Sequence, residues 1–339
     1  MTFAILAVAA TAAAQLETTH FDTTPLRDGN RFVLGGGIVD YATSLPEAEE
    51  KGIAFEVQAS GDLPLWGLDK VRRLASNETR LADRTRHWAT QGYATVTTRI
   101  RMLSADSAPV PPPSFMPRFT IQRIGFRQKS AKAADMLILN FVPFAHHSNG
   151  QTGCPLEVQE GDDCKPQVSA NHAIYAINTE DGNFSTHYVE IGACHRSIGL
   201  RADDGQITTE VTYGGALEQH IYGFDGAKGT LSDELAGRYG TTRLRAMAGV
   251  VWHFRDILDR LEMRFSGQRI VGQDIKPKRV GQFEALLHFG CWKDMGLFYR
   301  VYSGPDYYNV NFETHMLRAE FGAAFNWGGS DKRGLPSPF

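Results

Sequence analysis

Little in this sequence points to nucleic acid, to zinc or to a helical membrane anchor. Its 339 residues carry 35 basic and 38 acidic side chains. The resulting net charge of -3 gives no basic field that would attract a nucleic acid, so we expect no such partner. Helix-turn-helix, zinc-finger and glycine-rich phosphate-loop patterns are absent. Beyond the amino terminus no run of 18 apolar residues occurs, which argues against a membrane-spanning helix.

Cysteine is scarce, and the first residues of the chain indicate export. None of the four cysteines forms a C-x-x-C pair, which argues against structural zinc. Cys154 and Cys164 share a Gly/Asp-rich segment and are close enough to form a disulfide in an oxidising compartment.

Residues 1–14 are small and apolar and end in three alanines, which is typical of a secretory signal peptide, although a basic start is missing. The alternative for residues 1–14 is an alanine-rich helix of the core.

Several segments alternate between apolar and polar residues with a period of two, which predicts strands with one apolar face. In 317–327 the odd positions are apolar from Leu317 to Trp327, whereas Arg318 and Glu320 occupy even positions. Segments 243–254 and 281–291 alternate in the same way, apart from Leu286 in the second. Weaker alternation marks 53–60, 93–103, 261–269 and 297–302.

The length of these segments distinguishes between the possible all-β folds. The clearest are about ten residues long, which is what a tilted strand needs to cross a bilayer. Their polar faces carry arginine and glutamate, as the lumen of a barrel would. A soluble β-sandwich also alternates, but its strands are shorter on average. Together with the export signal, the pattern predicts an all-β, transmembrane antiparallel β-barrel of the outer-membrane type; a soluble periplasmic β-protein is the alternative.

Three parts follow the signal peptide in the predicted organisation. Residues 15–114 form an amino-terminal segment with early strands, and the near-helical spacing within 64–90 indicates a short helix, a plug or a loop. Prolines in 104–114 predict an extended or turn segment. Residues 115–339 form the barrel, with a long polar loop at 149–182 on its outer side.

The sequence His146-His147-Ser148-Asn149-Gly150 is the strongest chemical signal. His146 stands two residues before Ser148 at the end of a predicted strand, so base and nucleophile share one face. On the next predicted strand His187 has the parity of apolar residues such as Ile191, which predicts that it faces lipid. Glu190 has the opposite parity and is expected to face the lumen. The pattern predicts a lipid-facing His146–Ser148 pair with His187 as the third group.

The H-x-S-N-G motif resembles that of the outer membrane phospholipase A family. In that family the next strand carries S-x-N; here Ser185-Thr186-His187 stands in its place, with histidine instead of asparagine. Residues 302–309 are similar to the family's Gly-and-Asp-Tyr-Asn ending, and residues 115–119 resemble it more weakly. Residues 15–110 resemble the family only as a generic barrel.

The resemblance implies a barrel of about twelve strands in the outer membrane of a Gram-negative cell, with phospholipid as substrate. Ser148 would attack an acyl ester, His146 would act as general base and then acid, and His187 would orient His146. The Ser148 backbone N–H would contribute to the oxyanion hole. The resemblance also implies a Ca²⁺ ion, for which the Gln151 carbonyl and the Asn183 side chain are the matching ligands, and a homodimer as the active form.

Two other functions stay open at this point. Lipid A deacylases also carry H-x-S-N but use a glutamate as third residue; Glu190 is available here, although its parity is opposite to that of His187 and that family's barrel is smaller. A porin or structural barrel could carry the motif without catalysis.

The histidine at position 187 differs from the family's asparagine in one chemical property. Unlike asparagine, His187 can also take up a proton below neutral pH.

Overall fold

The computed structural model describes most of the chain between residues 31 and 326. The described ranges are 31–42, 52–68, 70–71, 85–104, 110–130, 132–157, 159–160, 165–166, 176–178, 181–200, 207–221, 233–254, 257–272, 278–291, 295–306, 312–313 and 315–326. The predicted signal peptide, residues 1–14, and Cys164 lie outside these ranges.

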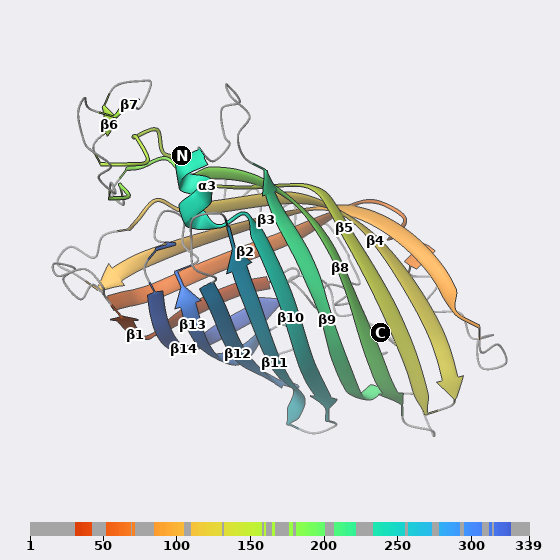
Figure 1. Ribbon diagram of the computed structural model, residues 1–339. Coiled ribbons are helices and arrows are strands. Elements are labelled where there is room, and N and C mark those ends of the chain that lie inside the picture. Colours follow the sequence, from red (N-terminus) through yellow and green to blue (C-terminus); the bar gives the residue numbers. More distant parts are fainter. Residues whose placement is uncertain are drawn as a thin grey trace.

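Twelve antiparallel strands close into a single barrel (Figure 1). They are β1 (Arg31–Ala42), β2 (Gly52–Trp66), β3 (His87–Ser104), β4 (Ser114–Ser130), β5 (Ala133–Ser148), β8 (Ser185–Leu200), β9 (Ile207–Ile221), β10 (Thr242–His253), β11 (Leu258–Val271), β12 (Lys278–Phe289), β13 (Met295–Pro305) and β14 (His315–Asn326). Each strand pairs with the next, and β1 closes the ring on β14. The short β6 (Gln159–Glu160) and β7 (Lys165–Pro166) pair with each other outside the ring.

The alternation read from the sequence corresponds to the two faces of the barrel wall. In β14, Leu317 and Phe321 are exposed on the outside, whereas Arg318 and Glu320 are buried in the lumen. The predicted strand at 243–254 is β10, where Leu244 is exposed and the arginines of opposite parity line a cavity. Apolar side chains therefore face outward and polar ones inward. The predicted fold, a transmembrane antiparallel barrel of the outer-membrane type, is confirmed.

Ion pairs inside the lumen join strands that are not neighbours in the ring. Arg101 on β3 reaches across to Asp306, just past β13, with Nη1 at 2.7 Å from Oδ2. Strands β3 and β13 are not neighbours in the ring, so this contact spans the interior. Arg318 contacts Glu56 at 3.0 Å, and Arg101 bonds to the same Glu56 carboxylate. Charge inside the barrel is thus neutralised by direct pairing, which a buried charge requires.

Apolar groups fill parts of the lumen as well. Leu286, the exception to the alternation of its segment, faces inward and packs with Phe298 and Ala324. A larger cluster includes Ile138 of β5 and Val71, which stands in the helical turn that follows Gly67. The prediction of a short helix or plug within 64–90 therefore corresponds, in its described part, to a turn whose Val71 side chain packs inside the barrel.

A second apolar cluster covers one end of the barrel. It joins the loop after β5, the helix α3 (Asp233–Tyr239) and the loop after β13. Its members are Leu156, Ile177, Phe184, Leu235, Ala236, Tyr239 and Phe312. Figure 1 shows α3 together with β6 and β7 at this end. We call this cluster the cap.

The cysteines behave largely as their spacing suggests. Cys154 is disulfide-bonded, in agreement with the predicted bridge, whose other member Cys164 lies outside the described residues. Neither Cys194 on β8 nor Cys291 is disulfide-bonded. Cys291 lies in the turn after β12, not inside a strand as the alternation of 281–291 indicated. No helix in the described ranges is long and apolar enough to span a membrane.

Candidate active site

A register shift in β5 decides which way the motif points. Before the shift, odd positions such as Phe141 are exposed on the outer face. The pairing with β8 is interrupted between Val142 and Ala145, and beyond it the even position Phe144 is exposed. This bulge puts the motif histidine and serine at positions 146 and 148 on the outer face, whereas uninterrupted alternation would have turned them inward.

His146 and His187 meet across the β5–β8 pair. The two residues are directly opposite in register, and their Nδ1 atoms are 3.2 Å apart, within hydrogen-bond distance. Their ring centroids are 4.7 Å apart, and the exposed Phe144 ring lies 5.5 Å from that of His187. One Nδ1 must carry the shared proton. If it is that of His146, the Nε2 of His146 keeps a lone pair that can accept a proton from a nucleophile.

Ser148 lies on the same face, one alternation beyond His146, with Ser185 opposite it on β8 and Phe115 opposite it on β4. Its Oγ makes no hydrogen bond to His146 in the described part of the chain. In enzymes without bound substrate, hydrogen bonds between catalytic groups are often long or not yet formed. Ser148 and His146 are two residues apart on the same face of β5, so their side chains are neighbours even without a hydrogen bond. The structure thus brings His146, His187 and Ser148 to one outward-facing site.

The last two residues of the motif fix the strand ends. The buried Asn149 amide donates to the Gly182 carbonyl at 2.7 Å, and its Oδ1 accepts from the Phe184 N–H at 2.9 Å. The Asn149 backbone N–H also donates to the Phe184 carbonyl, which extends the β5–β8 pairing past the strands. Gly150 has a φ of 70°, a conformation that glycine adopts without strain. Sequence reasoning assigned no task to either residue.

The lumen side of the same strands carries a different network. His147 is buried, lies 3.4 Å from Ser114 Oγ through Nε2, and packs edge-on against Phe184 of the cap. Opposite it on β8, Thr186 bonds to His220 Nδ1 at 2.9 Å, and His220 Nε2 lies 2.7 Å from Glu218. These contacts lie on the lumen side of β5 and β8 and do not reach the outer face.

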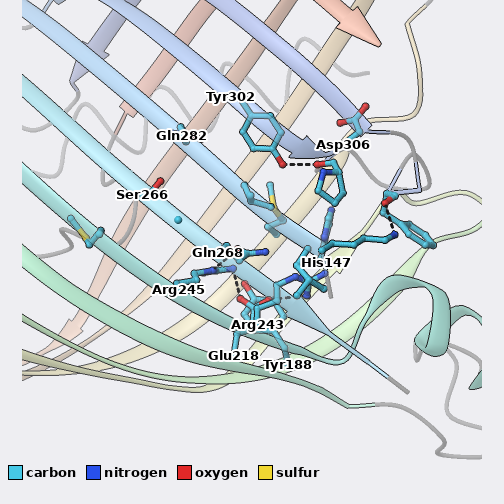
Figure 2. A pocket seen from close by; sticks show the side chains of 18 of the residues that line it. His147, Tyr188, Glu218, Arg243, Arg245, Ser266, Gln268, Gln282, Tyr302 and Asp306 are labelled. Atoms are coloured by element: carbon cyan, nitrogen blue, oxygen red, sulfur yellow. Dashed lines mark hydrogen bonds and ion pairs between the residues drawn. The ribbon is translucent and has the colours of Figure 1, made fainter. Parts of the chain in front are cut away.

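A cavity of about 330 Å³ lies under this network (Figure 2). His147, Tyr188, Glu218, Arg243 and Arg245 are among its lining residues, and they point together in the close view. The cavity therefore borders the inner surface of the strands whose outer surface carries His146 and Ser148.

Glu190 belongs to the lumen. It is buried and paired with Arg245, whose Nη1 lies 3.0 Å from Oε2. It therefore faces away from His146, as its parity indicated, and it is not positioned to orient that ring.

The two residues expected to hold calcium lie in the loops beside the site. The Gln151 N–H donates to Asn149 Oδ1 at 3.2 Å, and the exposed Asn183 donates its backbone N–H to the Gly153 carbonyl at 2.8 Å. No group of three or more His, Cys, Asp or Glu that could hold a metal occurs among the described residues. Calcium takes six to eight oxygen ligands, carboxylates among them. The described donors are therefore a poor fit to a resident calcium ion.

Comparison with known proteins returns other barrels. Outer membrane phospholipase A from Escherichia coli shares 12% identity over 88% of this chain and 90% of that chain, with a TM-score of 0.47. The Salmonella typhi outer membrane phospholipase dimer with bound calcium shares 12% identity over the same fractions, with a TM-score of 0.43. The β domain of the Bordetella autotransporter BrkA shares 8% identity over 88% and 98%, with a TM-score of 0.37. No protein-family model and no curated protein matches the sequence. Likenesses this distant carry no argument about function.

Proposed function

We propose that this protein is an outer-membrane phospholipase of the A type, a serine esterase that hydrolyses acyl esters of phospholipids. One observation carries the proposal: the 3.2 Å contact between His146 and His187 on the outer, lipid-facing wall, with Ser148 next on the same face. A base, a group that orients it and a nucleophile are the parts that a serine hydrolase requires.

The surroundings of the site favour a membrane lipid over a soluble ester. Phe144 is 52% exposed and lies against the His187 ring, and Ile191, 55% exposed, lies farther along the same outer wall opposite Phe141. Acyl chains could lie along these side chains while the ester reaches Ser148. The site stands at the end of β5 that leads into the long loop 149–184, and long loops of such barrels lie outside the cell. The substrate would then be a phospholipid in the outer leaflet of the outer membrane.

The proposed reaction follows from the orientation of the rings. Ser148 Oγ attacks the ester carbonyl carbon while its proton passes to Nε2 of His146. The imidazolium donates its Nδ1–H to the Nδ1 lone pair of His187, which therefore has to carry its own proton on Nε2. The tetrahedral intermediate collapses, and His146 protonates the departing lysophospholipid oxygen. Water, deprotonated by His146, then releases the fatty acid from Ser148.

The oxyanion needs donors near Ser148. The Ser148 N–H is the candidate that the resemblance implies. Gly150 supplies a second one, because its N–H donates to no other described residue and its φ of 70° turns the backbone sharply at this point. Donors that are already fixed in place stabilise developing charge without reorganisation.

Calcium and a homodimer remain predictions. Because the described residues fit a resident calcium ion poorly, none of the steps above depends on it. If calcium binds between Gln151 and Asn183, it would polarise the ester carbonyl, and further ligands would have to come from water, substrate or a second copy of the chain.

The competing functions fit the described residues less well. A lipid A deacylase would need Glu190 to orient His146, but Glu190 pairs with Arg245 inside the barrel. A diffusion pore would need an open lumen, but the cap covers one end and the Arg101–Asp306 pair crosses the interior.

Fatty-acid release from dioleoylphosphatidylcholine in mixed micelles tests the proposal. The wild-type protein should release fatty acid, and Ser148→Ala should release none above background. Parallel reactions with excess EDTA, and with Ca²⁺ added back, test the metal requirement separately. Release that persists unchanged in Ser148→Ala would contradict the proposed function.

A further inference from the structure

We propose that a second site on the outer wall, at the opposite end of β5, binds the phosphate of an anionic phospholipid in the inner leaflet. The site is built around the buried Asp135 and includes Arg86, Arg127, Lys129 and His195. We call these five residues the Asp135 cluster. The proposal does not depend on the protein being a hydrolase.

Asp135 holds three permanent cations in a fixed arc. Its Oδ1 accepts from Arg86 Nη2 at 2.8 Å, and its Oδ2 lies 2.6 Å from Arg127 Nη2 and 2.9 Å from Lys129 Nζ. His195 Nε2 adds a fourth contact at 3.7 Å. Asp135 is completely buried beneath them. An acid at the centre of the group organises the cations, whose side chains would otherwise be spread by mutual repulsion.

The cluster has more positive charge than its acid can neutralise. Three permanent cations face one carboxylate, so a surplus of positive charge remains even with His195 neutral. The side chains of Arg127 and Lys129 are 39% and 43% exposed, so this surplus is accessible from outside. A phosphate group supplies the negative charge and acceptor oxygens that such a group of donors binds.

The cluster faces outward and not into the lumen. On β4, Arg127 and Lys129 share the parity of the exposed Arg123, whereas Ile124 and Phe126 point into the interior. Arg123 lies over the ring of the exposed Trp88 at 4.8 Å. Tryptophan and arginine gathered on an outer wall are typical of the level of lipid headgroups.

The height of the cluster matches the inner leaflet. From Asp135 to His146, β5 rises about 35 Å along the strand. At a strand tilt of about 40° this covers about 27 Å of bilayer, close to the apolar band of such barrels. Between the two sites lie the exposed apolar side chains of Leu139 and Phe141. Only two residues separate the end of β4 from the start of β5 at the cluster end, as expected for the periplasmic side.

A membrane lipid fits this position better than free phosphate. The cluster borders exposed apolar surface, against which acyl chains can lie, and Tyr213 packs against His195 with ring centroids 5.3 Å apart. A lipid headgroup is held at this level by its own chains, whereas a dissolved anion gains nothing from them. Basic clusters beside membrane segments recognise anionic lipids in this way.

Native mass spectrometry of the full chain in neutral detergent tests the site. The protein is titrated with dioleoylphosphatidylglycerol and, separately, with dioleoylphosphatidylcholine. We expect the anionic lipid to bind about 10-fold more tightly or better, and Arg127→Gln/Lys129→Gln to abolish that preference. Arg127→Lys/Lys129→Arg keeps both charges and should restore it.

A matched variant controls for loss of charge. Arg269 and Arg279 are exposed and directly opposite each other on β11 and β12, near the other end of the barrel, and neither forms an ion pair with a described acid. Arg269→Gln/Arg279→Gln removes the same charge and should leave the preference intact. Heat-modifiable gel mobility verifies that each barrel is folded; if the double variant at Arg127 and Lys129 does not fold, Lys129→Gln alone should reduce the preference in the same direction.

Three outcomes would overturn the proposal. A preference for phosphatidylglycerol that survives in Arg127→Gln/Lys129→Gln would show that the cluster is not its source. An equal loss of preference in Arg269→Gln/Arg279→Gln would show that the preference depends only on the net charge of the protein. Displacement of the lipid by millimolar inorganic phosphate would show that the site takes a dissolved anion instead of a lipid.

Discussion

The outer and inner faces of the barrel wall around β5 each carry a histidine beside a serine. Outside, His146 and Ser148 lie at the lipid-facing wall, and His187 contacts the Nδ1 of His146. Inside, His147 lies 3.4 Å from Ser114, and both are buried under the cap. The inner pair is already within hydrogen-bond distance, but it faces the cavity of the lumen and not the lipid. The comparison teaches that residue type alone does not make a catalytic pair; exposure and an orienting partner distinguish the two.

One bulge separates these two outcomes. Pro143 lies in the interval where the β5–β8 pairing is interrupted, and proline has no N–H to donate to a neighbouring strand. The extra residue there turns His146 and Ser148 outward and His147 inward. Without it, His147 would have faced lipid and the proposed base would have been sealed in the lumen.

The largest expected difference is between the two serines. Ser148→Ala removes the proposed nucleophile and should lower kcat for phospholipid hydrolysis by about 10⁴-fold or more. Ser114→Ala removes only the inner hydroxyl and should leave kcat within about threefold. Ser114 is buried away from the proposed site, so its loss should affect the stability of the protein and not the chemical step. Initial rates of fatty-acid release from mixed micelles measure both. Equal losses in the two variants would remove the distinction between the faces.

The next effect concerns the orienting group. His187→Ala should lower kcat by about 10²-fold, because His146 loses the partner that fixes its tautomer. His187→Asn should stay within about tenfold of wild type, since an amide oxygen can accept the same N–H. If the alanine variant matched wild type while remaining folded, His187 would not be the third member.

The pH profile tests whether a histidine is the base. Proton abstraction requires a neutral His146, so kcat/KM should fall on acidification. His187→Asn keeps this base and should keep an acid limb. A wild-type profile that stays flat through acidic pH would contradict a histidine base.

The smallest expected effect concerns Asn149, and it tests whether this residue acts on activity locally or only through the stability of the whole barrel. Asn149→Ala leaves the Phe184 N–H and the Gly182 carbonyl without their buried partner and should lower the free energy of unfolding by about 2 kcal/mol. Because the end of the β5–β8 pair then loosens, activity should fall about tenfold.

Asn140→Ala is the matched control on the lumen face of the same strand. It removes a 3.0 Å hydrogen bond with Gln122 and should cost similar stability with little loss of activity. Urea unfolding and initial rates, measured on both variants, test the pair. Parallel losses of activity would mean that Asn149 acts only through global stability.

The fold was largely predictable because a barrel wall imposes one rule on every strand. Alternation with period two is local, so Leu317 and Arg318 reveal their faces without any knowledge of their neighbours. The contacts inside the lumen were not predictable, since Arg101 meets Asp306 only after the ring has closed. Leu286 broke the alternation for a reason visible only in three dimensions, namely its contact with Phe298.

The candidate site was predictable in its residues but not in its construction. Spacing predicted that His146 and Ser148 share a face and that His187 faces lipid, and these three residues do lie on the outer wall. The bulge in β5 was missed, and it lets odd positions before it and even positions after it face outward. Pro143, inside a predicted strand, was a usable signal of that bulge. The task of Asn149 was missed because its partners at Gly182 and Phe184 are distant in sequence.

Covalent labelling with a fluorophosphonate tests the central claim most directly, because the reagent modifies only an activated serine. We expect a single adduct on wild-type protein, mapped to Ser148 by peptide mass spectrometry. The adduct should persist in Ser114→Ala and disappear in both Ser148→Ala and His146→Ala. No adduct on the folded wild-type barrel, or an adduct elsewhere that survives Ser148→Ala, would contradict the account.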